Sequence, residues 1–138
     1  MLQAEAARCR YGSGMAAKIL ICDNEDALRE LVRATLAPGG YETVEARDGD
    51  QSLEVARRER PDLIVLDMMM PGRTGVEVLR ELRADPRFSA TPVVMLTART
   101  QARDRDAAEA AGADRFVAKP FSPRELGAVV DSLLKDGA

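Results

Sequence analysis

The chain has 138 residues, the size of one domain with a substantial core. Apolar residues make up 46% and charged residues 31% of the sequence, which is ordinary for a globular protein. The net charge of −3 argues against a nucleic-acid-binding surface, which is usually basic. No apolar run approaches the length of about 18 residues that crosses a bilayer. We therefore expect a single domain that neither inserts into a membrane nor binds nucleic acid directly.

Particular residue types narrow the chemistry further. The chain has no histidine, so it offers no histidine base, no histidine metal ligand and no phosphohistidine of its own. Cys22 lies in an apolar run and is interpreted as a small buried hydrophobe, not as part of a disulfide framework. Residues 1–16 lack a signal peptide's apolar stretch and are expected to be a disordered extension or an expression remnant. This leaves residues 17–136 as the domain and the cytoplasm as its expected location.

Beyond this extension, a short apolar run is followed by a turn and a segment of helical periodicity, and the unit occurs five times. The first run, ILIC (19–22), precedes a helix that stops at Pro38-Gly39-Gly40. The second run, YETVEA (41–46), is more polar and is expected at a sheet edge. A second helix, marked by Leu53 and Ala56, follows it.

Three further units complete the chain. LIVL (63–66) precedes a third helix, and VVML (93–96) precedes a weakly anchored helix, rich in alanine and charge, over 101–111. RFVA (115–118) precedes a final helix, for which Ser122-Pro123 supplies a cap and a first turn. Continuous apolar runs of this kind predict strands that are buried on both faces. The sequence therefore predicts an α/β fold, a doubly wound parallel sheet with helices on both faces.

Polar residues follow four of the five predicted strands. Asp23 and Asn24 follow the first strand, Asp67 the third, Thr97 the fourth and Lys119 the fifth. Ligands of an open parallel sheet bind beyond the carboxyl ends of its strands, so these groups are expected to meet. The two carboxylates suit Mg²⁺, and a carboxylate can accept a phosphoryl group. Lys119 would supply a positive charge and Thr97 a hydroxyl donor.

Each residue alone also has a simpler explanation. Asp67 or Thr97 is explained as a helix cap, and Asp23 as an acid at the start of a helix. Lys119 is explained as a solvated charge, and Met68–Met70 as core filler. The joint placement at four strand ends is what favours a shared site.

Four segments resemble the successive signatures of response-regulator receiver domains of two-component signalling. They are ILICDNEDALRELV, PDLIVLDMMMPGRTGVEVLRELR, TPVVMLTA and GADRFVAKPF. The resemblance covers residues 17–136. It implies a flavodoxin-like (βα)5 fold with a five-stranded parallel sheet of order 2-1-3-4-5, similar to single-domain chemotaxis regulators.

The resemblance implies a phosphoacceptor and a metal site. Asp67 is expected to receive a phosphoryl group from a phosphohistidine on a histidine kinase or phosphotransfer protein. Asp23, Asp67 and the backbone carbonyl of Met69 are expected to hold Mg²⁺ or Mn²⁺. The family usually has a second acid where this chain has Asn24, a neutral ligand. We therefore expect weaker metal binding, with Asn24 contributing weakly or indirectly.

The resemblance also implies a switch. Thr97 is expected to be the switch hydroxyl, Phe116 the switch aromatic and Lys119 the partner of the phosphate, with a cis bond from Lys119 to Pro120. The chain would catalyse its own phosphorylation and dephosphorylation. Phosphorylation would then alter the surface around the fourth helix, fifth strand and fifth helix. That surface would bind a downstream protein or form a homodimer.

Met69 and Arg99 lie two residues beyond the acceptor and switch positions. In the family these places flank the path of the hydrolytic water, so their bulk predicts slow autodephosphorylation.

Three alternatives stay open. A pseudo-receiver that docks partners without phosphorylation is favoured by Asn24 and opposed by Asp67, Thr97 and Lys119. A metal-dependent hydrolase is disfavoured because the chain has no cap domain and no second acid beside Asp67. The third alternative is a receiver fragment of a longer regulator with a DNA-binding or enzymatic output.

Overall fold

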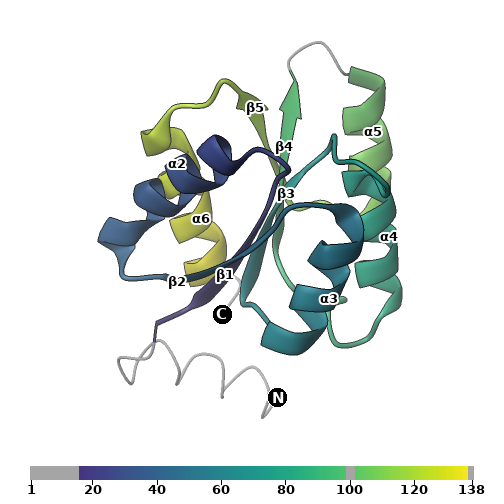
Figure 1. Ribbon diagram of the computed structural model, residues 1–138, viewed down its shortest axis with the longest axis horizontal. Helices are drawn as coiled ribbons and strands as arrows, with labels where there is room; N and C mark the ends of the chain where they lie inside the picture. Colours follow the sequence, from purple (N-terminus) through teal and green to yellow (C-terminus); the bar gives the residue numbers. More distant parts are fainter. Residues whose placement is uncertain (1–15, 99–101, 137–138) are drawn as a thin grey trace.

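The computed structural model describes residues 16–98 and 102–136, in which strands alternate with helices (Figure 1). The strands are β1 (Lys18–Cys22), β2 (Glu42–Ala46), β3 (Leu63–Asp67), β4 (Val93–Ala98) and β5 (Arg115–Lys119). The helices are α2 (Asp26–Leu36), α3 (Gly49–Glu59), α4 (Gly75–Ala84), α5 (Ala102–Ala111) and α6 (Pro123–Asp136), with a 3-10 turn, η1 (Ala37–Gly39), after α2.

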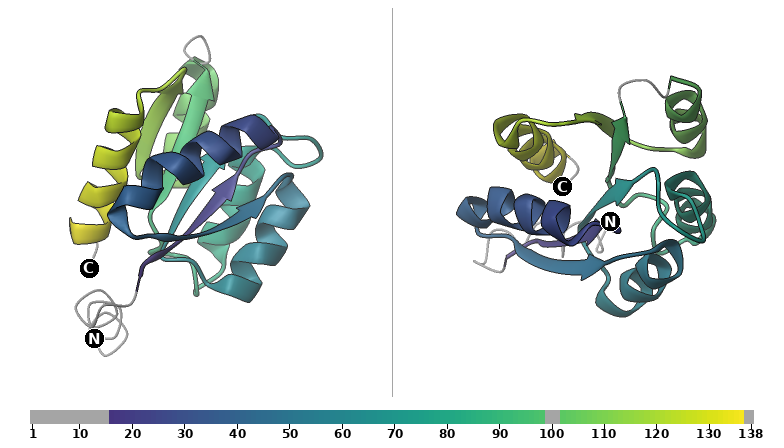
Figure 2. Two further views of the ribbon diagram at one scale, coloured as in Figure 1. Left: turned by 60° about the vertical axis from the view of Figure 1, so that its left-hand side comes forward. Right: turned by 45° about the horizontal axis from the view of Figure 1, so that its top comes forward.

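The strands form one parallel sheet in the order β2-β1-β3-β4-β5. Helices α2 and α6 cover one face of this sheet, and α3, α4 and α5 cover the other (Figure 2). The predicted doubly wound fold, its strand order and the edge position of the polar strand β2 are therefore confirmed. None of the helices in the described part of the chain is long and apolar enough to span a membrane.

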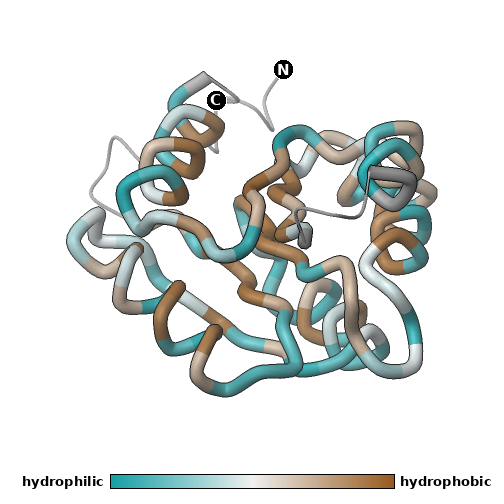
Figure 3. Tube along the Cα trace, turned by 90° about the horizontal axis from the view of Figure 1, so that it is seen from above, coloured by the Kyte–Doolittle hydropathy of each residue, from teal (hydrophilic) through white to brown (hydrophobic). Residues whose placement is uncertain are grey.

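Side chains along each strand alternate between two core layers, one on each face of the sheet. In β3, Ile64 and Leu66 pack toward α3, α4 and α5, whereas Leu63 and Val65 pack toward α2 and α6. Figure 3 shows hydrophobic residues concentrated along the central strands. Cys22 is completely buried in the layer under α3, α4 and α5, which confirms its interpretation as a small buried hydrophobe.

Local signals fix where the helices begin and end. The hydroxyl of Thr74 accepts a hydrogen bond from the Glu77 N–H at 3.3 Å, and the Glu77 carboxylate accepts one from the Thr74 N–H at 2.8 Å. This capping box starts α4. The Asp48 carboxylate starts α3 by accepting from the Gln51 N–H at 2.7 Å. Helix α2 ends where the 3-10 turn that contains Pro38 begins.

Strands β3, β4 and β5 run further than the apolar runs predicted. Asp67 still pairs with Leu96, and Thr97 with Ala118, while Lys119 is the last residue of β5. The sequence placed Asp67, Thr97 and Lys119 just beyond the strands, and this boundary was wrong by one or two residues. A polar residue can stay in the ladder because strand pairing uses only backbone groups. The sheet itself therefore holds these three side chains.

Candidate functional site

Asp67 ends the fully buried strand β3 and is itself only 3% exposed. One carboxylate oxygen, Oδ1, lies 3.1 Å from the ammonium nitrogen of Lys119 on β5. The same oxygen accepts a hydrogen bond from the backbone N–H of Met69 at 3.3 Å. The acceptor predicted from the sequence is therefore a buried carboxylate that is fixed from two sides.

Asp23 follows β1 directly and is completely buried. Its Oδ1 accepts from the Glu25 N–H at 2.9 Å, and its Oδ2 accepts from the Lys119 ammonium at 3.1 Å. Lys119 thus bridges Asp23 and Asp67, two residues that lie 44 positions apart in the sequence. Three of the predicted site residues are brought together at the carboxyl edge of the sheet.

Burial and a neighbouring carboxylate make Asp67 costly to ionise. Burial raises the pKa of Asp67, and the negative charge of Asp23 raises it further, while Lys119 and the Met69 N–H oppose the change. Burial acts to lower the pKa of Lys119, but Asp67 and Asp23 outweigh it and leave this pKa above its ordinary value. Lys119 is therefore a stable cation between two anions.

The two predicted switch residues lie on the neighbouring strands β4 and β5. Thr97 is buried on β4, and the described residues show no hydrogen bond from it to Asp67 or Lys119. Phe116 on β5 is half-buried and packs against the core layer under α3, α4 and α5. Its ring lies 4.9 Å from the guanidinium carbon of Arg105 on α5. The structure thus places the Phe116 ring against α5.

The loop after β3 is close-packed. A Cβ at Gly75, the first residue of α4, would lie 2.4 Å from the Asp67 carbonyl oxygen and 2.8 Å from the Met68 Cα. Gly72 has φ +79°, which turns the chain between strand and helix. Met68 and Met70 are buried and Met69 is 56% exposed. Two of the three methionines are core residues, and Met69 stands at the surface.

Of two further predicted features, the structure describes one. The bond from Lys119 to Pro120 is cis, as the resemblance implied. Arg99, expected to slow loss of the phosphoryl group, lies outside the described residues.

The residues present offer oxygen ligands of the kind that a divalent cation takes. No group of three or more acidic, histidine or cysteine side chains that could hold a metal occurs in residues 16–98 and 102–136. Asp23 and Asp67 nevertheless supply two carboxylates whose repulsion a cation would relieve, and the Met69 carbonyl would add a hard oxygen. Asn24 is exposed at the edge of this site and offers a neutral amide oxygen. With Asn24 in place of an acidic residue at position 24, the site has one negative charge fewer.

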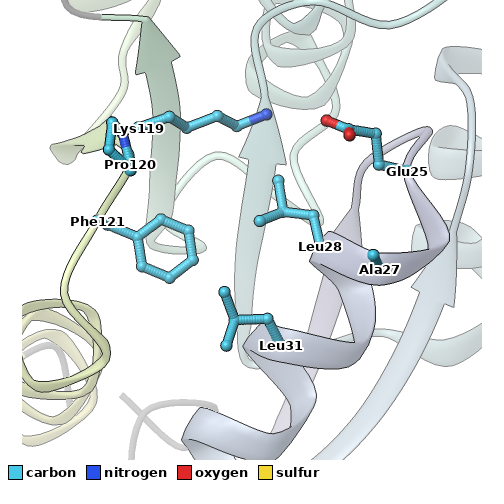
Figure 4. Close-up of a pocket in the computed structure, with 7 residues that line it drawn as sticks. All are labelled: Glu25, Ala27, Leu28, Leu31, Lys119, Pro120 and Phe121. Atoms are coloured by element: carbon cyan, nitrogen blue, oxygen red, sulfur yellow. The ribbon is translucent and has the colours of Figure 1, made fainter.

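A surface hollow of about 430 Å³ opens beside Lys119. Figure 4 shows Leu28 and Leu31 of α2 facing Phe121, with the ends of the Lys119 and Glu25 side chains above them. Leu31 is 43% exposed, which is unusual for so large an apolar side chain. The site is thus bordered by an apolar surface.

Sequence reasoning missed one contact of this site. Arg29 of α2 donates a hydrogen bond to the carbonyl oxygen of Asp23 at 2.6 Å. The only signal in the sequence is a long basic side chain one turn into the helix that follows Asp23. Such a residue is usually a solvated charge, so the pattern alone did not single it out.

Comparisons with known proteins identify the family of this chain. The profile of the response regulator receiver domain matches residues 19–131. The DNA-binding response regulator MtrA of Mycolicibacterium smegmatis is 43% identical over 121 residues, which are 88% of this chain and 52% of that protein. The transcriptional regulatory protein PhoP of Bacillus subtilis, named for alkaline phosphatase synthesis, is 40% identical over 121 residues, or 88% of this chain and 50% of PhoP. The chain spans about half the length of these relatives.

Solved structures show the same relationship. The chemotaxis response regulator CheY4 of Vibrio cholerae matches with a TM-score of 0.81 and 34% identity, covering 86% of this chain and 99% of that chain. The receiver domain of the Francisella response regulator 1452 matches with a TM-score of 0.81 and 30% identity, covering 88% and 99% respectively. The resemblance found in the sequence is confirmed, and this chain belongs to the response regulator receiver domain family of two-component signalling.

Proposed function

We propose that this chain is a phosphorylation switch whose acceptor is Asp67. The observation that carries the proposal is the position of the Lys119 ammonium, 3.1 Å from Oδ1 of Asp67 and 3.1 Å from Oδ2 of Asp23. This arrangement holds a buried nucleophilic carboxylate next to a cation that can pair with phosphoryl oxygens. A histidine kinase or a histidine phosphotransfer protein is the proposed donor, because the chain has no histidine of its own.

The proposed step is a phosphoryl transfer between two side chains. A carboxylate oxygen of Asp67 attacks the phosphorus of a phosphohistidine, the phosphorus–nitrogen bond breaks, and the imidazole leaves with the electron pair and takes up a proton. The product is an aspartyl-phosphate. Lys119 pairs with the negative charge that arrives on the phosphoryl oxygens.

Asp23, Asp67, the Met69 carbonyl and, more weakly, Asn24 would hold Mg²⁺ or Mn²⁺. A divalent cation there would neutralise the carboxylates and orient the phosphoryl group. The raised pKa of Asp67 supports this assignment, because the repulsion from Asp23 that contributes to it is what a cation would cancel. The missing acid at position 24 predicts weak binding.

We assign the readout to Thr97 and Phe116. Thr97 follows Leu96, the ladder partner of Asp67, on β4. Phe116 lies on β5, with its ring against Arg105 of α5. A shift of the Thr97 hydroxyl toward the phosphoryl group would change the packing of Phe116 and the surface of α5, β5 and α6. That surface would then bind a downstream protein or a second copy of the chain, in the cytoplasm.

The test uses a small phosphodonor. The chain is incubated with acetyl phosphate, with and without Mg²⁺, and its intact mass is measured. The expected result is a Mg²⁺-dependent gain of one phosphoryl group that is absent in Asp67→Ala. A folded protein that gains no mass under any condition would favour the phosphorylation-independent docking module that Asn24 suggests.

A second candidate concerns the whole protein. The two curated relatives are named as DNA-binding or transcriptional regulators, and the chain covers about half of each. This observation favours a receiver that controls a separate output domain. Co-purification of the phosphorylated chain with such a domain, absent for Asp67→Ala, would support it.

A further inference from the structure

Arg29 reaches from α2 back to the ends of two strands. Its Nη1 donates to the Asp23 carbonyl oxygen at 2.6 Å and its Nε donates to Glu45 Oε1 on β2 at 2.9 Å. Its Nη2 also pairs with Asp26 at the start of α2. The side chain is only 12% exposed. One guanidinium therefore joins the end of β1, the strand β2 and the helix α2.

The carbonyl of Asp23 depends on this donor. The Asp23 N–H donates to the Ala46 carbonyl at 3.1 Å, and in a strand the N–H and C=O of one residue face the same neighbour. Strand β2 ends at Ala46, so the ladder supplies no next N–H for the Asp23 carbonyl. Arg29 donates the hydrogen bond to this carbonyl instead. A buried carbonyl without a donor would cost about 1–3 kcal/mol.

The same carbonyl belongs to the peptide group that joins Asp23 to Asn24. On one side of this group, the Asp23 carboxylate contacts Lys119 at 3.1 Å. On the other side, Asn24 starts the exposed turn into α2. A rotation of this peptide plane would move the Asp23 carboxylate and the Asn24 side-chain amide relative to Asp67.

We propose that Arg29 is a positioning residue, which fixes the Asp23–Asn24 peptide plane and so sets how this loop meets a divalent cation. The inference rests on the proposed function. Its basis is geometric, because Asp26 and Glu45 both pair with Arg29 and offset its positive charge. A lysine at this position would keep the charge but would lack the fork that reaches the Asp23 carbonyl and Glu45 together.

The test measures Mg²⁺ binding directly, by calorimetry on the unphosphorylated chain. Arg29→Met is expected to raise the Kd for Mg²⁺ about tenfold, the lower end of the effect of groups that orient metal ligands. Arg29→Lys is expected to fall between Arg29→Met and the wild type. Glu45→Gln, which leaves the donor to Asp23 in place, is expected to bind Mg²⁺ as the wild type does.

Arg83 provides a matched control. It is another largely buried arginine, 17% exposed, that donates to the carbonyls of Phe88 at 2.8 Å, Thr91 at 2.7 Å and Gly112 at 2.8 Å, outside the site. Arg83→Met is expected to lower the free energy of unfolding without changing the Kd for Mg²⁺. A Mg²⁺ affinity that falls equally in Arg83→Met and Arg29→Met would show only general destabilisation and overturn the inference.

The remaining outcomes separate the two proposals. Normal binding by the wild type with an unchanged Kd in Arg29→Met and Arg29→Lys overturns the positioning role and leaves the proposed function standing. No Mg²⁺ binding by the wild type overturns both the metal site and the role of Arg29. If Arg29→Met does not fold, the test uses Arg29→Lys and Glu45→Gln instead. A higher Kd for Mg²⁺ in Arg29→Lys, with an unchanged Kd in Glu45→Gln, supports the inference.

Discussion

Asp67, Asp23 and Lys119 show how single residues at this site trade stability for reactivity. Two carboxylates and one ammonium lie together in a buried setting, with a net charge of −1. Burial and Asp23 raise the pKa of Asp67, so its ionised form is disfavoured in the folded state. Folding thus disfavours the ionised form of Asp67, which is the form that would accept a phosphoryl group.

Asp67→Asn is therefore expected to stabilise the protein at neutral pH. A raised pKa in the folded state means that Asp67 favours folding below its ordinary pKa of 3.8, and that this favour is lost as the pH rises through the raised value. The free energy of unfolding at pH 7 should rise by about 0.5–2 kcal/mol in the variant. Urea unfolding from pH 7 down to pH 4 measures this, and a gain that does not shrink toward acid pH would contradict the explanation.

We expect Asn24 to govern how strongly the site binds a divalent cation. Asn24→Asp would add a third carboxylate, which should tighten Mg²⁺ binding by about tenfold, or about 1.4 kcal/mol. The metal-free variant should be less stable than the wild type because three carboxylates then repel one another. Calorimetric titration with Mg²⁺ checks the affinity, and Glu25→Gln serves as the neighbouring control. Equal affinities for Asn24→Asp and the wild type would refute the assigned role of position 24.

We expect Met69 to shield the phosphoryl group that Asp67 is proposed to accept. Its side chain is 56% exposed at the mouth of the site, only two residues after the acceptor. Small polar replacements at Met69 and at Arg99 together should shorten the lifetime of the phosphorylated protein several-fold by admitting water. The lifetime is measured by the decay of the phosphorylated intact mass after the donor is removed. An unchanged lifetime would remove both residues from this role.

At the scale of elements, the contact between β3 and α4 leaves no room for a methyl group. The Gly75 N–H donates to the Met68 carbonyl at 3.0 Å, and the two backbones are in close contact there. The capping box of Thr74 and Glu77 fixes the first turn of α4 at the same point. The helix start and the end of the acceptor strand are therefore one packed unit.

Gly75→Ala should disrupt this unit. The added Cβ would lie 2.4 Å from the Asp67 carbonyl oxygen, so β3 or α4 would have to move. We expect a loss of about 1–3 kcal/mol in the free energy of unfolding and slower phosphorylation by acetyl phosphate. Gly127→Ala in α6 is the control, because nothing lies within 4 Å of its added Cβ. There the better helix propensity of alanine should stabilise the protein by about 0.5–1 kcal/mol. Similar effects of both substitutions would contradict the packing argument.

For the molecule as a whole, most of the fold could be predicted from the sequence because its signals are local and repeated. Five apolar runs gave the strands, and the polarity of YETVEA gave the edge. Asp23, Asp67 and Lys119 were placed together because parallel strands end at one edge. The position of Phe116 against α5, with Arg105 over its ring, could not be predicted, because it depends on side-chain packing between distant elements. The contact from Arg29 to the Asp23 carbonyl escaped prediction for the same reason.

Global stability should also report on the buried thiol of Cys22. Burial raises the pKa of Cys22 to about 12 from 9.0, partly opposed by a hydrogen bond from Ser52 and reinforced by Asp23 and Asp67. Because the unfolded thiol ionises first, the free energy of unfolding should fall by about 1.4 kcal/mol per pH unit from pH 9 toward pH 12 through this group. Cys22→Ala should lack this component. If the free energy of unfolding falls equally with pH in Cys22→Ala and the wild type between pH 9 and pH 12, the assignment to Cys22 is contradicted.

The division of the core by the sheet has a consequence for how such a chain can change over generations. The layer under α2 and α6 and the layer under α3, α4 and α5 draw on alternate residues of the same strands. Among the residues that the structure describes, they share no core side chain. Substitutions in one layer should therefore add to those in the other with little interaction. Each face can accumulate its own substitutions and acquire its own partners, while the strand ends that both faces share keep the residues of the site.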